Sequence, residues 1–386
     1  MKILSIPMDA GGDMPPVVAT MLGLYERGHE VLVYSERSAN RIMQDVELRK
    51  ITSPREIEFS TRLIGALRDA SEVGEEKSGI VLKRTLREYS HDQAEAAERL
   101  VLDGFQPDLV VTSLVGAGIA RQIAGKAGVP FCVMNSDFYI GPDPPRSLEE
   151  DFDERSRPEV EYLAEQMQHA DLVLHAVDQI FDYGFDRLPP HNHYVGPLLW
   201  EKPAPVPEYL EEPGNPWVLV TISSQKQQDA MIARLSLEAL SNQSVRIIET
   251  IGRGHRRKEL GPIPSNAHVE HFAPHSKILS QCELMVSHAG IGSVMKAMWY
   301  GVPMLLVPWG RDQPGVAARG EHLGVAKVLP RNKLTKRVLE AAIHEVLDEP
   351  RYQHQATLTA QRLRREDPVA TACDLIEHLI RQNRQP

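Results

Sequence analysis

Residues 287–313 read SHAGIGSVMKAMWYGVPMLLVPWGRDQ. An apolar run at Glu283–Ser287 leads into this stretch and predicts a buried strand that ends at His288. A glycine-rich turn follows, and the spacing of the apolar residues beyond it predicts a helix over Gly292–Tyr300. A second short apolar run, Pro303–Val307, predicts the next strand. A strand, a helix and a strand in this order are typical of a parallel α/β sheet.

The turn after the first of these strands has the properties of an anion-binding site. A helix N-terminus carries free N–H groups, and small residues before it let a phosphate approach the backbone closely. His288 and Ser293 add side-chain donors to this turn. One strand later, Asp312 and Gln313 would project from the carboxyl edge of the sheet, where open α/β folds bind ligands. The alternative interpretation is a tight turn of glycines followed by a capped helix.

Short apolar runs alternate with longer amphipathic stretches along the whole chain. This alternation predicts two α/β domains of similar size, over residues 1–200 and 217–386. Residues 201–216 contain five prolines and no apolar period, so we interpret them as an interdomain linker. Further strands are expected at Lys2–Pro7, Glu30–Tyr34, Asp108–Thr112, Pro130–Met134, Asp171–Ala176, Trp217–Ile222 and Val245–Glu249. Further helices are expected at Pro16–Arg27, Gly118–Ala127, Asp229–Leu240 and Val316–His322, with two or three more in Lys333–Gln382.

The composition excludes several classes of protein. Of the 386 residues, 43 are basic and 53 acidic, and the resulting net charge of −10 argues against a broad nucleic-acid surface. No apolar run approaches the roughly 18 residues that a membrane span needs. The beginning of the chain does not resemble a signal peptide. The three cysteines are far apart and lack CxxC spacing, which excludes a disulfide scaffold or a zinc ribbon. These observations predict a reduced, soluble, cytoplasmic protein.

Several motifs together carry a resemblance to a known family. His-x-Gly-x-Gly-Ser from His288, Gly-Val-Pro from Gly301 and Pro-x-x-x-Asp-Gln from Pro308 follow one another at fixed spacing. With the upstream segment Val269–Leu279, they resemble the nucleotide-sugar-dependent glycosyltransferases of family 1, which have the GT-B fold. The resemblance implies two Rossmann-like, doubly wound domains that face each other across a cleft. The C-terminal domain would bind the donor, the N-terminal domain the acceptor, and the last helix would cross back to the first domain.

The resemblance also implies which residues bind the donor. His288 and Ser293, with Gly290 and Gly292 beside them, would contact the diphosphate, and Asp312 and Gln313 the hydroxyls of the sugar. The nucleotide base would lie near Phe272 and His275. Ser224, in the place of the family's Gly-Ser loop, would donate to a phosphate or the sugar, and its alternative role is that of a simple helix N-cap.

Lys296 stands where the family usually has the glutamate that holds the nucleotide ribose. A lysine cannot accept hydrogen bonds from ribose hydroxyls. We therefore expect a weakened ribose contact and poor discrimination between ribose and 2′-deoxyribose donors. The alternative is that Lys296 points to solvent from the first turns of its helix.

The catalytic base is expected in the first domain. Many family members place a histidine after the first strand, but no histidine precedes His29 here. The loop from Asp9 to Pro16 instead is similar to the Gly-Asp-x-x-Pro loop of antibiotic- and sterol-type members, which makes Asp13 the candidate base. Ser113 occupies the place of the family's base-orienting aspartate, so Asp13 would act alone. The competing interpretation of Asp13 is a solvated turn carboxylate.

These residues lead to a hypothesis about function. The chain would be an inverting, metal-independent hexosyltransferase that moves a sugar from UDP or dTDP to a small hydrophobic natural-product acceptor, as in antibiotic biosynthesis. It would need no cofactor and would be a monomer or homodimer. The alternatives are a catalytically silent nucleotide-sugar-binding partner protein, a GT-B sugar-nucleotide epimerase and a lipid glycosyltransferase. The sequence leaves open the acceptor, the choice between UDP and dTDP, and O-, N- or C-linkage.

Three other patterns resemble metal or ligand sites. Asp151-Phe152-Asp153 has the form of a metal-binding Asp-x-Asp, but it lies in an acidic run and is interpreted as a solvated face. His268, His271 and His275 could supply zinc ligands by number, yet they fall in the expected base-binding segment. The segment His191–His193 is expected to be a surface loop.

Overall fold

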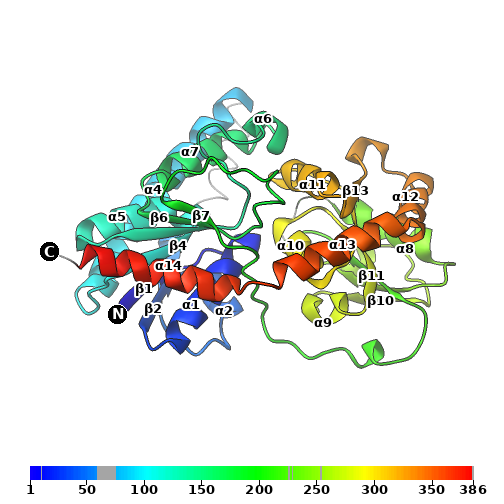
Figure 1. The fold of residues 1–386 in the computed structure, drawn as a ribbon, viewed down its shortest axis with the longest axis horizontal. Coiled ribbons are helices and arrows are strands. Elements are labelled where there is room, and N and C mark those ends of the chain that lie inside the picture. The colour runs from blue at the N-terminus through cyan, green and yellow to red at the C-terminus, as the bar shows by residue number, and fades with distance from the viewer. Residues whose placement is uncertain (10, 59–74, 225–226, 228, 253, 385–386) are drawn as a thin grey trace. The chain divides into compact units, whose positions relative to one another are not determined.

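The computed structural model describes residues 1–384 apart from residues 10, 59–74, 225–226, 228 and 253. The chain divides into two compact units (Figure 1). The first comprises Met1–Glu149, Asp153–Trp200 and Asp367–Pro386, and the second comprises Glu150–Phe152 and Glu201–Glu366. No helix in the described part of the chain is long and apolar enough to cross a bilayer.

A seven-stranded parallel sheet forms the centre of the first unit, in the order β3-β2-β1-β4-β5-β6-β7. Its inner strands read as nearly continuous apolar runs because helices cover both faces. The strands are β1 (Lys2–Ile6), β2 (Glu30–Ser35), β3 (Arg49–Thr52), β4 (Leu109–Ser113), β5 (Phe131–Asn135), β6 (Leu172–His175) and β7 (Asn192–Tyr194).

Two layers of helices enclose this sheet. Helices α1 (Met14–Glu26) and α14 (Pro368–Asn383) pack side by side and share one apolar core with the strands (Figure 1). Helices α4 (Glu75–Ala97), α5 (Ala117–Ala127) and α7 (Arg157–Met167) contact one another in a second layer. The short helices are α2 (Arg37–Ile42) and α6 (Leu148–Asp151). Two prolines in the first turn of α1 fit positions whose N–H groups have no helical partner.

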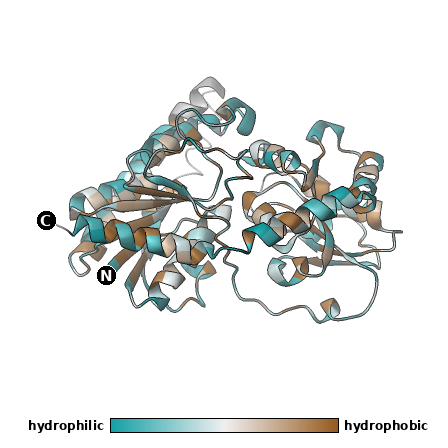
Figure 2. Cartoon of the chain, viewed as in Figure 1, coloured by the Kyte–Doolittle hydropathy of each residue, from teal (hydrophilic) through white to brown (hydrophobic). Residues whose placement is uncertain are grey.

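The second unit has a six-stranded parallel sheet in the order β10-β9-β8-β11-β12-β13. Its strands are β8 (Trp217–Thr221), β9 (Arg246–Thr250), β10 (Ala267–Glu270), β11 (Cys282–Ser287), β12 (Met304–Leu306) and β13 (Ala326–Val328). Its helices are α8 (Ala230–Leu240), α9 (His275–Leu279), α10 (Ile291–Tyr300), α11 (Gln313–His322), α12 (Lys336–Asp348) and α13 (Pro350–Leu363). Helices α8 and α12 share an apolar core with the strands. Figure 2 shows apolar residues concentrated on the strands of both sheets.

Each sheet has one topological switch point, where connections leave in opposite directions. In the first sheet it lies between β1 and β4, and in the second between β8 and β11. Ligands of open α/β sheets bind in the crevice at the carboxyl ends of the strands at such a point. The fold therefore predicts a ligand-binding site in each unit, at the carboxyl ends of the strands that flank its switch point.

The α/β class and the parallel sheets are confirmed. The alternation of apolar and amphipathic segments in the sequence did not predict four of the strands, β3, β7, β10 and β13. The expectation of a surface loop at His191–His193 was wrong, because Asn192–Tyr194 is strand β7 and the Asn192 side chain is buried.

Candidate functional sites at the two switch points

Asp13 lies at the switch point of the first unit, between the end of β1 and the start of α1. Its side chain is only 5% exposed. The Ser136 Oγ donates to Asp13 Oδ1 at 3.1 Å, and the Val115 backbone N–H donates to Oδ2 at 3.3 Å. Ser136 follows β5 and Val115 follows β4, so the carboxyl ends of three neighbouring strands converge on this carboxylate.

Burial raises the pKa of the Asp13 carboxyl group, while Ser113, followed by Val115 and Ser136, opposes the rise. Val115 and Ser136 make well-formed hydrogen bonds to the carboxylate, whereas the Ser113 Oγ beside it makes none. The competing interpretation of Asp13 as a solvated turn carboxylate is wrong, because the side chain is buried and two donors from other loops hold it.

The turn between β11 and α10 lies at the switch point of the second unit. Gly290 is the N-cap residue of α10, and no side chain in the described part of the chain caps this helix end. A Cβ atom on Gly290 would lie 2.5 Å from His288 Nε2, so only glycine lets the imidazole ring lie over the turn. Gly292 and Ser293 occupy the first turn of α10 and are half-buried. A helix end of this kind offers free N–H groups to an anion.

His288 is buried, and burial lowers the pKa of its imidazole. Its Nδ1 lies 3.4 Å from the carbonyl oxygen of Thr221, at the end of β8. Because a carbonyl only accepts, Nδ1 carries the hydrogen in this contact, and the neutral ring then presents a lone pair at Nε2. His288 can therefore donate from Nε2 only after it takes up a proton.

Gln313 begins α11 and is almost fully buried. Its Oε1 accepts from the backbone N–H groups of Trp309 and Gly310 at 2.8 and 3.1 Å, and its Nε2 donates to Gln227 Oε1 at 3.1 Å. The second N–H of the Gln313 amide has no partner among the described residues. Asp312, the N-cap residue of α11, is half-buried beside it.

Asp229 and His255 form a buried pair that the sequence analysis missed. The Asp229 carboxylate accepts from the Ser223 N–H at 2.8 Å and from Gln227 Nε2 at 3.1 Å, and its Oδ1 lies 3.0 Å from His255 Nε2. Asp229 precedes α8 in sequence, which reads as an ordinary N-cap, but its side chain makes no cap hydrogen bond. It instead holds the loop after β8 and, through Gln227, connects it with Gln313.

The residues expected near the nucleotide base lie at the same edge of the second sheet. Phe272 follows β10 and is 53% exposed, an unusual exposure for a phenylalanine. His275 begins α9, and its Nε2 lies 2.9 Å from Thr250 Oγ1. Desolvation, with a smaller contribution from Lys296, lowers the pKa of His275 to about 4, so this ring is neutral. Ser224 is exposed in the loop after β8 and makes no side-chain cap of α8.

Lys296 does not point to solvent, which corrects that alternative. Its Nζ donates to Glu201 Oε1 at 2.5 Å, and the lysine and glutamate side chains are only 17% and 14% exposed. Glu201 also accepts from the His275 N–H, the Ser276 N–H and the Ser276 Oγ at 2.7 to 3.1 Å. Although burial opposes it, Lys296 and Ser276 hold the pKa of Glu201 below its usual value. The four donors occupy all the lone-pair positions of the Glu201 carboxylate, whereas two N–H groups of Lys296 have no partner among the described residues.

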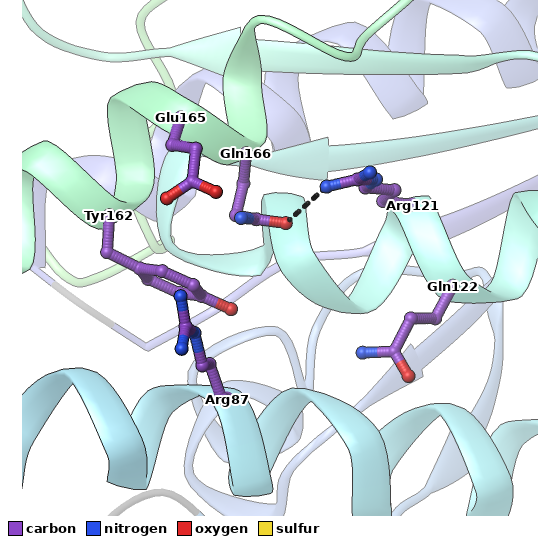
Figure 3. Close-up of a pocket in the computed structure, with 6 residues that line it drawn as sticks. All are labelled: Arg87, Arg121, Gln122, Tyr162, Glu165 and Gln166. Carbon is purple, nitrogen blue, oxygen red and sulfur yellow. Dashed lines mark hydrogen bonds between the residues drawn. The ribbon is translucent and has the colours of Figure 1, made fainter.

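The remaining candidates lie elsewhere. Asp151 is not a solvated residue, because it is buried and its Oδ2 lies 2.9 Å from Arg319 Nη1 within the second unit. Among the described residues no group of His, Cys, Asp and Glu side chains could hold a metal ion. A polar surface pocket between α4, α5 and α7 contains none of the predicted site residues (Figure 3). In it Arg121 donates to Gln166 at 3.2 Å.

Known proteins share the fold of this chain. Residues 234–378 match the family described as Erythromycin biosynthesis protein CIII-like, C-terminal domain. The solved structure of CalG4, the calicheamicin glycosyltransferase, superimposes with a TM-score of 0.79 at 19% identity and covers 100% of this chain and 99% of that one. The chain has the GT-B fold. Glycosyltransferase VinC, solved in complex with dTDP, has a TM-score of 0.71 at 20% identity, with 99% and 100% of the two chains covered.

Curated relatives confirm the resemblance to the family 1 glycosyltransferases. The chain is 31% identical over 221 residues to 4'-demethylrebeccamycin synthase of Lentzea aerocolonigenes, covering 55% of this chain and 51% of that protein. It is 22% identical over 359 residues to NDP-glycosyltransferase YjiC of Bacillus subtilis (strain 168), covering 89% and 88%. The chain spans about half the length of the first curated relatives that it matches.

Proposed function

We propose that this GT-B chain is an inverting, metal-independent glycosyltransferase that moves a hexose from UDP or dTDP to a small hydrophobic natural product. The observation that carries the proposal is Asp13, a buried carboxylate held by two donors at the switch point of the first sheet. The names of the relatives support the substrate class, since they include a demethyllactenocin mycarosyltransferase and an oleandomycin glycosyltransferase.

In the proposed reaction Asp13 accepts the proton of the acceptor hydroxyl. The oxygen then attacks the anomeric carbon of the donor, the bond to the diphosphate breaks, and the configuration at that carbon inverts. A buried carboxylate with a raised pKa is a stronger base than an exposed one. General-base help of this kind contributes about 10²–10⁴-fold to a rate.

The second unit would bind the donor and take up the charge of the leaving diphosphate. The N–H groups at the start of α10 and the Ser293 hydroxyl are donors fixed before the reaction. His288 would join them in its protonated form. Gln313 would donate its free amide N–H to the sugar, and the exposed Phe272 ring would lie against the nucleotide base.

Asp13→Asn tests the proposal directly. With UDP-glucose or dTDP-glucose and a panel of phenolic and macrolide acceptors, the variant should turn over about 10²–10⁴-fold more slowly. Its affinity for the nucleotide should stay unchanged, because Asp13 lies in the other unit. Asp9→Asn is the matched control, since Asp9 is exposed in the same loop. Nucleotide binding without any turnover in the wild type would instead identify a silent binding partner.

A further inference from the structure

The loop after β5 is closed by the side chain of Asn135. Its Nδ2 donates to the Phe138 carbonyl oxygen and lies 3.0 Å from His175 Nδ1, while its Oδ1 accepts from the Asp137 N–H at 3.1 Å. Asn135 is fully buried. Every polar atom of its amide group is thus used to fix residues 135–138.

His175 anchors this loop to the next two strands. The ring is fully buried at the end of β6, and its Nε2 lies 2.9 Å from Asn192 Oδ1 in β7. Burial lowers the pKa of His175 to about 4, so the ring is neutral at pH 7. The two neighbouring amides assign the hydrogen: Nε2–H donates to Asn192, and Nδ1 accepts from Asn135.

A second anchor fixes the far end of the loop. The Tyr139 N–H donates to Asp182 Oδ2 at 2.8 Å, and the Tyr194 hydroxyl donates to the same oxygen at 2.6 Å. Ser136 lies between the two anchors and is 7% exposed. The position of Ser136 is therefore set by buried groups on β6, on β7 and in the loop between them that contains Asp182.

We propose that Ser136 is a positioning residue for the base Asp13, and this inference rests on the proposed function. Ser136 and the Val115 N–H each bind one carboxylate oxygen, so together they fix the plane of the carboxylate and leave a lone pair on each oxygen for the acceptor proton. Ser136 also donates to the ionised form of Asp13 and so counters the effect of burial.

Ser136→Ala removes the donor without adding bulk. It should move the acidic limb of the pH profile of kcat/KM to higher pH, because Asp13 then holds its proton more tightly. The loss of kcat/KM should be largest at the acidic end of the profile and should shrink as the pH rises, because the base ionises in both proteins at high enough pH. Ser136→Thr keeps the hydroxyl and should restore the wild-type limb.

Ser5→Ala is the matched control, since Ser5 is a fully buried serine of β1 whose Oγ has no partner among the described residues. It should leave the pH profile in place. Ser113→Ala tests whether Ser113, the other serine beside Asp13, is the residue that lowers the pKa of Asp13. A shifted limb in Ser113→Ala together with an unshifted limb in Ser136→Ala would overturn the proposal.

A second measurement does not depend on turnover. The ¹³Cγ signal of Asp13, assigned by its loss in Asp13→Asn, reports the pKa of this carboxyl group during an NMR titration. The pKa should be higher in Ser136→Ala than in the wild type and in Ser136→Thr. An unchanged pKa with normal transferase activity would refute the inference alone, whereas a shifted pKa in a protein without transferase activity would refute the proposed function.

Discussion

Glu249 is a carboxyl group in the core of the second unit, and its burial predicts a large effect of pH on stability. It lies on β9, in register with Val220 of β8 and Val269 of β10. It is fully buried, and neither oxygen has a hydrogen-bond partner among the described residues. Ile247 and Ile251, which share its face of the strand, belong to the apolar core. Burial raises the pKa of Glu249 to about 8.

The raised pKa fixes the sign and the size of the effect. Between the usual value of 4.5 and about 8, the folded state holds a proton that the unfolded state releases. The contribution of Glu249 to the free energy of unfolding is therefore most favourable below pH 4.5 and falls as the pH rises toward 8. At about 1.4 kcal/mol for each pH unit, the wild type loses about 3 kcal/mol of stability at pH 7 through this group.

Glu249→Gln keeps the shape of the side chain and removes its titration. A buried amide without partners also costs free energy, but this cost does not change with pH. The difference in stability between variant and wild type should therefore move by about 3 kcal/mol in favour of the variant between pH 5 and pH 8.

Urea unfolding followed by tryptophan fluorescence measures this difference. Three of the four tryptophans, Trp217, Trp299 and Trp309, lie in the second unit with Glu249. Glu283→Gln, at an exposed position near the start of β11 in the same sheet, is the matched control and should show no such trend. A difference that is the same at pH 5 and pH 8 would refute the reasoning, because Glu249 would then titrate as it does in the unfolded chain.

Three further predictions concern the donor site. Binding of UDP-glucose should tighten as the pH falls from 8 to 6, by up to about tenfold per pH unit, because His288 donates from Nε2 only when protonated. His288→Ala should abolish this pH dependence and weaken binding, measured by calorimetry, by about 1.5–3 kcal/mol. UDP and dTDP should bind within about tenfold of each other, since Lys296 cannot accept from a ribose hydroxyl and Glu201 has no acceptor capacity left while Lys296 donates to it. A larger preference of the wild type for either nucleotide would contradict this. Gly290→Ala should reduce nucleotide affinity at least tenfold in a folded protein, because the new Cβ displaces the His288 ring.

The strands that sequence patterns missed share one physical property. β3 and β7 are the two edges of the first sheet, and β10 and β13 are the two edges of the second. Edge strands are short and partly polar, as the sequences RKIT of β3 and AHVE of β10 illustrate. The patterns that identify parallel strands depend on burial on both faces, which only the inner strands have.

The residues of the candidate sites also fall into two groups, those that a local sequence motif reveals and those that it does not. Motifs within one loop, such as the Gly-rich turn before α10 or the loop with Asp13, are visible in the sequence because neighbouring residues form them. Ser136 lies 123 residues from Asp13, and Glu201 lies 95 residues from Lys296. Only the order of strands in the sheet and the course of the linker bring such partners together, and no local pattern encodes either.

The two switch points offer opposite chemistry on the same architecture, and the proposed reaction explains why they are kept on separate sheets. An acceptor hydroxyl needs a proton acceptor, and the loop after β1 supplies the Asp13 carboxylate. A diphosphate needs donors, and the turn after β11 supplies helix N–H groups. A carboxylate 4 Å from a phosphate would repel it by about 4 kcal/mol at the effective dielectric constant near a protein surface. In the proposed reaction, two Rossmann-like units keep the Asp13 carboxylate and the anion-binding turn before α10 on different sheets.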